Sequence, residues 1–475
     1  MAQIPIPLGP ASDKARQHQG GGAVLTNCYV ERTEGGKTGY SINTRPRLKL
    51  FSDIEGGGPC RGAVAIGSNV LYVVSGEGLF KVGSGGGAVR IGTVMGQLPV
   101  IMTVNRKAPN KQIAITADTH NYVVENDVVS EVTDLDLPSG VHSNCYINGR
   151  TVYGIADGTF YLSAENDSGS VNALDFAEAE RESDEGVRVF SWGEDFWYFG
   201  TRSLEIFRTT GDAFPFAPLL GAGRSDGGGC AAKYSVSGAS DMVVWVNDYF
   251  NVVASSGGQP QRISTHEVDR DIARAMALGL KDEITGFSYD VEGHLFYYLR
   301  CPLWCWKHDF ATGFWFKVTS YLSDTFRCGH YVSAFSKDLL LDVTEGKIYE
   351  YSLSTRDDAG EPCVMAIETG PVAAFPDGYV CNSLKLDVMR GVGVATEDDH
   401  AKDPKIILSV SRDGGMTWGR EYLNSAGMQG KYSAEVRFNR LGSCSGAGMA
   451  FKISMPEPVE RAVFQAVADV SPLRN

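Results

Sequence analysis

The sequence has no apolar run near the ~18 residues that a membrane-spanning helix requires. Basic residues are also scarce, since 43 Lys and Arg stand against 57 Asp and Glu and the net charge is −14. A protein that grips nucleic acid by neutralising its phosphates needs a net basic face, so this function class is disfavoured. The first residues lack the basic region and apolar core of a secretory signal, and we expect no secretion signal.

Signatures of cofactor, metal and nucleophile chemistry are missing too. The stretch Gly35-Gly36-Lys37-Thr38 imitates the end of a phosphate loop, but Glu31 stands where the first glycine belongs. No G-x-S-x-G elbow occurs. Cys301 and Cys305 have no second pair at zinc spacing, and the ten cysteines are scattered. We therefore expect buried thiols, no metal, no cofactor and no enzymatic activity.

What the sequence does contain is 56 glycines, a 43% hydrophobic fraction and a repeated strand unit. Short apolar strands recur with Gly, Asn or Asp turns between them, and the central strands of successive units are centred at residues 71, 113, 152, 197, 244, 296 and 340. The separations lie between 39 and 52 residues. A period of this length with about four short strands per unit is typical of a β-propeller blade, whose inner strands are buried on both faces.

The fold predicted is all-β, with a β-propeller of six or seven blades followed by a C-terminal antiparallel β-sandwich-like domain. Two stacked β-sandwiches are the alternative. We expect residues 1–50 to form an N-terminal extension or closing segment, residues 51–355 the propeller and residues 356–475 the C-terminal β domain. The polar stretch 356–362 is interpreted as the linker between the last two.

Helices are expected to be few. The pattern Ser264-Thr265-His266-Glu267 is a capping box, and apolar residues at helical spacing follow until Gly279. A second, acidic stretch from Ala173 to Glu185 is interpreted as a solvated helix.

One motif is specific. Residues 411–418 match the Asp-box S-x-D-x-G-x-T-W at each fixed position, which are Ser411, Asp413, Gly415, Thr417 and Trp418. In such a hairpin turn the aspartate accepts backbone N–H bonds, the glycine permits positive φ and the tryptophan packs beneath. We interpret these five residues as a structural turn rather than as a catalytic site.

Several long stretches carry a resemblance to a known family. They are residues 27–31, 46–51, 259–266, 287–297, 309–315, 410–418 and 437–442. In these stretches the sequence resembles the packaged-DNA stabilisation proteins of short-tailed bacteriophages, which form the tail nozzle. The Cys- and Trp-rich stretch 301–306 departs from the family pattern.

The resemblance implies a structural virion protein with no catalytic residues, assembled in the bacterial host cytoplasm and located in the virion tail. It implies a homo-hexameric ring below the portal and its adaptor ring, which extends the DNA channel, retains packaged DNA and lets it exit on infection. Tail fibres or spikes, and a needle or plug, are the further partners that it implies. Six copies at −14 would carry −84, so DNA would pass through the lumen without specific binding.

Two alternatives remain open from the residues. Because Asp-boxes recur in sialidases, a sialidase-like glycosidase is one of them, and it would need a cluster of arginines with a Tyr/Glu pair at the propeller axis. A propeller that binds host glycans without cleaving them is the other, and it would need aromatic residues along an exposed groove.

Overall fold

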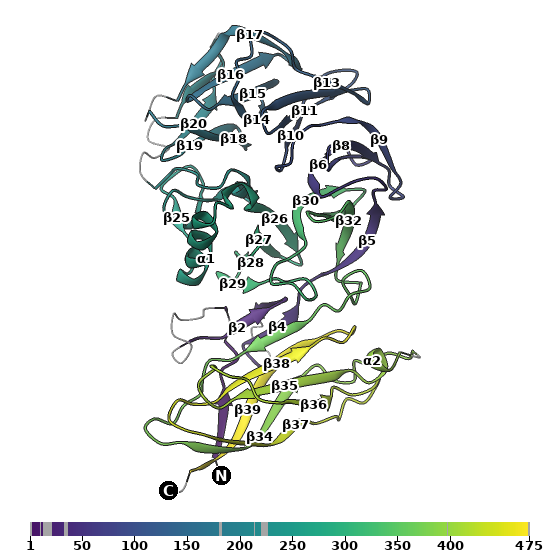
Figure 1. The fold of residues 1–475 in the computed structure, drawn as a ribbon, viewed down its shortest axis with the longest axis vertical. Coiled ribbons are helices and arrows are strands. Elements are labelled where there is room, and N and C mark those ends of the chain that lie inside the picture. The colour runs from purple at the N-terminus through teal and green to yellow at the C-terminus, as the bar shows by residue number, and fades with distance from the viewer. Residues whose placement is uncertain are drawn as a thin grey trace.

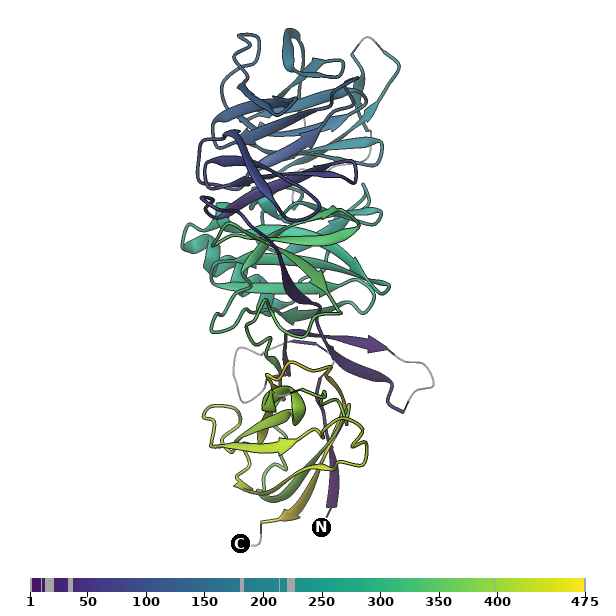
Figure 2. The ribbon, with the colours of Figure 1, turned by 90° about the vertical axis from the view of Figure 1, so that its right-hand side faces the viewer.

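A computed structural model describes residues 2–9, 11–12, 21–32, 37–179, 183–212, 214–219, 227–396 and 398–473. Blades surround a central axis in the upper part of the molecule, and a β-sandwich lies below them (Figure 1). Seen from the side, the β3–β4 hairpin projects from the junction of the two domains (Figure 2). In the described residues no helix is long and apolar enough to cross a membrane.

Seven four-stranded antiparallel blades make up the propeller within the described part of the chain. The first three blades are β6 (Cys60–Ile66), β7 (Val70–Ser75), β8 (Gly78–Val82) and β9 (Ala88–Thr93); β10 (Ile101–Val104), β11 (Gln112–Ala117), β12 (His120–Glu125) and β13 (Val128–Glu131); and β14 (Val141–Ile147), β15 (Arg150–Ile155), β16 (Thr159–Ala164) and β17 (Asp167–Glu178). The next two are β18 (Gly186–Trp192), β19 (Asp195–Gly200), β20 (Leu204–Thr209) and β21 (Phe216–Pro218); and β22 (Ser237–Ala239), β23 (Met242–Val246), β24 (Val252–Ser255) and β25 (Gln261–Arg262). The last two are β26 (Thr285–Val291), β27 (His294–Cys301), β28 (Trp304–Asp309) and β29 (Phe314–Lys317); and β30 (Cys328–Ala334), β31 (Lys337–Asp342), β32 (Lys347–Ser352) and β5 (Arg47–Asp53).

Each of the seven predicted central strands is the second strand of a blade, and the propeller prediction is confirmed. First strands of neighbouring blades contact each other around the axis, for example β10 with β14 and β14 with β18, and β30 of the last blade contacts β6 of the first. The outer strand of the last blade comes from the N-terminal side of the chain, because β5 pairs with β32 from Asp53–Lys347 to Arg47–Ser352. The ring is therefore closed by two segments that lie far apart in the sequence.

The sandwich has two packed sheets, and its prediction is confirmed as well. One sheet contains β3 (Cys28–Arg32), β4 (Tyr40–Thr44), β39 (Ala462–Pro472), β34 (Tyr379–Val388), β37 (Val436–Cys444) and β1 (Ala2–Ile6). The other contains β33 (Met365–Glu368), β38 (Ala450–Met455), β35 (Lys405–Ser411) and β36 (Glu421–Ser425). Residues 1–50 are thus divided, since β1, β3 and β4 lie in the sandwich while β5 lies in the propeller.

A short strand joins the two domains into one sheet. Strand β2 (Val24–Thr26) pairs in parallel with β29 of the sixth blade and antiparallel with β33 of the sandwich. The sheet that results has nine strands, in the order β26-β27-β28-β29-β2-β33-β38-β35-β36. Backbone hydrogen bonds therefore continue from blade six into the sandwich.

The two helix predictions have different outcomes. Helix α1 (His266–Ala277) is present, and its N-cap is Thr265, whose side chain accepts a bond from the Val268 N–H. The acidic helix predicted for Ala173 to Glu185 is wrong, because its first part is the outer strand β17, paired with β16; residues 180–182 lie outside the described residues. The remaining helices are short: α2 (Asp399–Lys402), η2 (Lys233–Ser235) and η3 (Lys281–Glu283).

All ten cysteines are buried and free. Burial raises their pKa where a shift is resolved, for example to about 12 for Cys60 and Cys145. Because the thiolate is the reactive form, these thiols are packing residues at neutral pH.

Candidate functional site

An ion pair is buried where the chain crosses between the domains. The Arg45 guanidinium lies 2.6 Å and 3.2 Å from the two carboxylate oxygens of Asp358, and both side chains are almost fully buried. Burial alone would lower the pKa of Arg45, but the charge of Asp358 raises it well above its usual value. The guanidinium also donates to the side chain of Asn27 and the carbonyls of Pro46 and Thr319. The Arg45–Asp358 pair thus joins the two segments of the chain that pass between the propeller and the sandwich.

The stretch 356–362, predicted to be a linker, lies between the propeller strand β32 and the sandwich strand β33, and Asp358 is its buried residue. Asp358 also accepts a bond from the backbone N–H of Leu48, and Ala359 donates its N–H to the Leu48 carbonyl. The stretch is the connection between the two domains, and the bond of its Asp358 to the buried Arg45 is a feature that its polar composition did not predict.

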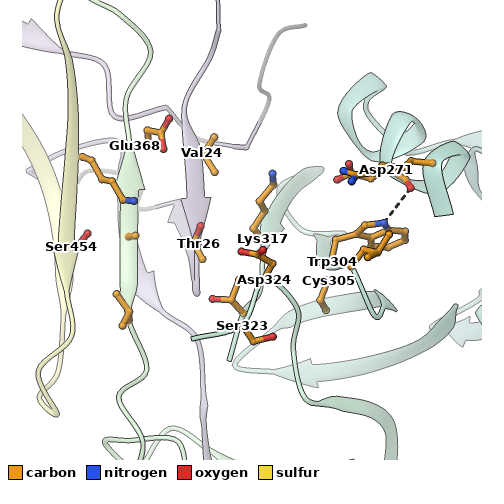
Figure 3. A pocket seen from close by; sticks show the side chains of 16 residues that line it. Val24, Thr26, Asp271, Trp304, Cys305, Lys317, Ser323, Asp324, Glu368 and Ser454 are labelled. Carbon is orange, nitrogen blue, oxygen red and sulfur yellow. Dashed lines mark hydrogen bonds between the residues drawn. The ribbon is translucent and has the colours of Figure 1, made fainter. Parts of the chain in front are cut away.

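A cleft of about 490 Å³ lies beside this junction (Figure 3). Its walls come from both domains, with β2 between them, and the labelled side chains include Asp271, Lys317 and Asp324 from the propeller and Glu368 and Ser454 from the sandwich. The Trp304 indole N–H donates to the Asp271 carbonyl, and Lys317 pairs with Glu267 at 2.9 Å. Mixed charge of this kind suits a polar seam between domains better than a reaction site.

Lys307 on β28 is a buried lysine surrounded by aromatic rings. Its side chain is fully buried, and Nζ has no hydrogen-bond partner among the described residues. The ammonium lies 4.4 to 6.0 Å from four ring centres, those of Phe296, Tyr29, Phe316 and Tyr298. Burial lowers the pKa of Lys307 to about 7. Because Tyr29 belongs to β3, this cage links blade six to the N-terminal strands.

The Asp-box forms the turn between the paired strands β35 and β36. The carboxylate of Asp413 accepts the Met416 N–H at 3.0 Å, the Thr417 N–H at 2.9 Å and the Ser411 hydroxyl at 2.7 Å. The Thr417 hydroxyl is its fourth donor. These bonds, led by the Thr417 hydroxyl, hold the pKa of Asp413 well below its usual range. Gly415 has φ +91° and donates to Ser411, and Trp418 is half-buried.

Replacing Asp413 by alanine is expected to open this turn without changing the rest of the molecule. The Met416 and Thr417 amides lose their acceptor, so their hydrogen exchange should be much faster than in the parent protein. Hydrogen exchange read by mass spectrometry checks this. Asp413→Asn keeps one acceptor oxygen and is the matched control. Unchanged exchange at both amides in Asp413→Ala would mean that the carboxylate does not hold the turn.

The inner wall of the propeller axis has a repeated irregularity. Four first strands begin with a register shift that leaves one residue unpaired: Arg61 in β6, His142 in β14, Val187 in β18 and Gly329 in β30. Bulges of this kind re-aim side chains and are frequent beside binding sites. The shifts lie at the same end of each strand, so the four unpaired residues lie at one mouth of the propeller axis.

Charged side chains from several blades influence one another at this mouth. The Arg61 guanidinium is occupied by backbone carbonyls, those of Leu98, Gly76, Val94 and Met95. Burial and then the charge of Arg188 lower the pKa of Lys233 to about 8. Burial, then Lys233 and Arg188, lower the pKa of His142 to about 3, so this ring is neutral near pH 7. Sequence reasoning missed this cluster, because its members are spread over four repeats.

A sialidase-like site would require several arginines free to hold a substrate, with a Tyr/Glu pair. Here Tyr234 lies near Arg188, Asp118, Asp282 and Arg61, and burial raises its pKa. The largest charges that act on Tyr234 are those of arginines and aspartates, and Arg61 donates to four backbone carbonyls. Within the described residues, no group of three or more His, Cys, Asp or Glu could hold a metal ion.

Comparison with protein families gives two matches that cover nearly the whole chain. Residues 3–355 match the model described as bacteriophage P22 Gp10, beta-propeller, and residues 370–471 match the model described as bacteriophage P22 Gp10, beta-sandwich. A comparison with curated protein sequences gives no match.

Solved structures that resemble the chain do so at low sequence identity. Virginiamycin B lyase from Staphylococcus aureus is 9% identical, covers 65% of this chain and 99% of its own, and has a TM-score of 0.45. The WD40 propeller domain of Doa1 is 12% identical, covers 65% and 98%, and has a TM-score of 0.41. The designed protein Ika8 is 11% identical, covers 64% and 100%, and has a TM-score of 0.41. These scores carry no conclusion about function.

Proposed function

The chain belongs to the family of bacteriophage P22 Gp10 and is a tail structural protein of a phage, and from this premise we propose that it is one subunit of a hexameric tail nozzle. The nozzle would extend the DNA channel below the portal and adaptor ring, retain packaged DNA and let it exit on infection. The observation that carries the proposal is the pair of family matches, which span both domains in order. The sandwich would dock fibres or spikes or complete ring contacts, and a needle or plug would close the far end.

The joint between the domains supports a mechanical role. The nine-stranded sheet, the Arg45–Asp358 pair and the bonds of Asp358 and Ala359 to the Leu48 backbone connect propeller and sandwich at several points. A channel wall under the pressure of packaged DNA needs such a connection. The net charge of −14 per chain supports a lumen that repels phosphates, so DNA would slide without sticking.

Exposed apolar side chains on the outer rim support assembly with a second copy. Leu135 is 99% exposed and Leu174, on β17, is 82% exposed. Their segments lie side by side, because Asp134 accepts the Val171 N–H at 2.9 Å. Large apolar side chains that protrude in this way are typical of interfaces. We propose that these two leucines lie in the contact between ring neighbours.

The purified protein mixed with its adaptor ring is expected to form a sixfold assembly by native mass spectrometry. The double variant Leu135→Asp/Leu174→Asp should shift the population to monomers, because two carboxylates would be buried in the contact. Leu322→Asp is the matched control, since Leu322 is 90% exposed on the loop between β29 and β30. Persistent monomers of the parent protein would contradict the hexamer, while a sixfold assembly of the double variant would contradict only the rim contact.

A sialidase assay tests the glycosidase alternative. Turnover of a fluorogenic sialoside that is lost on replacing Arg188 by methionine would overturn a purely structural role. We expect no turnover above the buffer blank.

A further inference from the structure

The fourth blade presents three different side chains in one row across neighbouring strands. Trp192 on β18 stands opposite Asp195 on β19, and Asp195 stands opposite Arg208 on β20. Directly opposite residues of antiparallel strands point to the same face of a sheet, and neighbouring strands lie about 4.8 Å apart. An aromatic ring, a carboxylate and a guanidinium are therefore side by side at one end of this blade.

A tight loop and an ion pair hold this row in place. Gly193 and Glu194 are the two loop residues between β18 and β19, and Gly193 has φ +64°, which two-residue hairpin loops favour at this position. Arg208 donates to both carboxylate oxygens of Asp195, from Nε at 2.7 Å and from Nη2 at 2.8 Å. This two-point contact fixes the plane of the guanidinium, which has further N–H groups that can donate to a ligand.

The tryptophan ring is held across the boundary between the fourth and fifth blades. It lies against Gly238 of β22, where any side-chain carbon would clash with the ring. Phe190, two residues earlier on β18, lies nearly parallel to the Trp192 ring, with 6.2 Å between the ring centres. The Trp192 side chain is thus fixed in orientation, and because it is half-buried, part of its surface stays open to solvent.

A cleft of about 550 Å³ lies between these two blades. This volume is in the range of small-molecule binding sites. The fourth blade contributes the whole row to the lining, and the fifth blade contributes Ser240 and Asp241, which are exposed in the turn between β22 and β23. The cleft therefore combines one open aromatic surface with both donors and acceptors of hydrogen bonds.

We propose that this cleft binds one neutral sugar unit of a saccharide. A pyranose ring has an apolar face of C–H groups, which can pack on an indole, and a rim of hydroxyls that both donate and accept. The Trp192 ring matches the apolar face. Arg208 can donate to sugar oxygens, and Asp241 can accept from sugar hydroxyls. The site adds a ligand to the chain and does not rest on the ring assembly proposed above.

The charges of the cleft disfavour ionic ligands. Glu194, Asp195 and Asp241 bring three carboxylates to the lining against the one guanidinium of the row, so an acidic sugar or a phosphate is repelled. An alkylammonium ligand is typically held by a cage of aromatic faces. Here Trp197 is only 3% exposed, so of the two tryptophans in the lining Trp192 alone offers ring surface. A ligand with hydroxyls and no charge fits these groups best.

The test uses the full chain and a panel of neutral disaccharides that contain glucose, galactose, mannose or rhamnose. Saturation-transfer NMR identifies those that bind, and calorimetry gives the Kd of the strongest. We expect saturable binding with a Kd of about 10 mM or below. Trp192→Ala should weaken the affinity at least about tenfold, or roughly 1.4 kcal/mol. Tyr321→Ala is the matched control and should leave the Kd unchanged, since Tyr321 is an exposed ring outside the cleft.

Asp241→Ala separates binding from folding. Because Asp241 is an exposed turn residue, this variant should keep the thermal midpoint of the parent while its affinity for the disaccharide falls. A parent protein that binds none of the panel at about 50 mM, several times the expected Kd, would overturn the proposal. So would an affinity that is unchanged in Trp192→Ala or in Asp241→Ala, or tighter binding of a methyl sialoside or of tetramethylammonium. If Trp192→Ala does not fold, the Asp241→Ala result decides.

Discussion

Replacing Asp358 by alanine is expected to lower the free energy of unfolding by about 3 to 5 kcal/mol, because it leaves the Arg45 guanidinium buried without its counter-charge. The change also removes the acceptor of the Leu48 N–H, where the chain enters the propeller. The loss should therefore be seen in both domains. Chemical denaturation followed by tryptophan fluorescence and by circular dichroism measures it.

A second variant separates the charge from the contact. In Arg45→Met/Asp358→Leu both charges are replaced by apolar groups, and most of the lost stability should return, because no ion remains buried without a partner. Asp358→Asn is the conservative control, and it should lie between the parent and Asp358→Ala. If Asp358→Ala unfolds at the same denaturant concentration as the parent, the pair does not fasten the junction.

Replacing Lys307 by methionine is expected to stabilise the protein near pH 6 by a few kcal/mol. Burial lowers the pKa of Lys307 to about 7 in the folded protein, while an unfolded lysine titrates near 10.5. The folded protein therefore loses the Lys307 proton at a lower pH than the unfolded chain does. Below pH 7 the parent bears the full cost of the buried charge. Between pH 7 and 10.5 the unfolded chain binds the extra proton, so parent stability rises with pH by about 1.4 kcal/mol per unit.

The measurement is the difference in unfolding free energy between Lys307→Met and the parent at pH 6, 8 and 9.5. Taking the difference removes the contributions of titrating groups that do not interact with Lys307. The advantage of the variant should shrink steadily as the pH rises. A pH-independent difference would show that Lys307 does not lose its proton in the fold. A variant less stable than the parent at pH 6 would show that contacts of the ammonium with Tyr29 and Phe296 outweigh burial.

The blade repeat was predictable because burial on both faces makes the second strands continuous apolar runs, such as 70–74 and 242–246. The blade number stayed open at six or seven because the last blade takes its fourth strand, β5, from the N-terminal side of the chain. The stretch 173–185 has the Ala, Glu and Asp content of a helix, but pairing with β16 overrides that propensity in β17. Local composition cannot report a partner that lies elsewhere in the chain.

The cluster of charged residues at the mouth of the propeller axis was likewise not predicted from local composition. Arg61, His142 and Arg188 each lie within the first three residues of an inner strand, in the first, third and fourth blades, but they differ in residue type. Aligning the starts of the seven units on one another would have placed these residues in neighbouring columns. The buried pair of Arg45 and Asp358 had no such signal, because 313 residues separate its members.

The pairing of Ala2 with Val470 has a consequence for synthesis on the ribosome. Strands β1 and β4 emerge early, yet their partner β39 is translated only after the seven blades. The propeller can close as soon as residue 352 has left the exit tunnel, whereas the first strands must wait for most of another domain. During that interval the nascent chain exposes unpaired strand edges, which are prone to pair with other chains while translation continues.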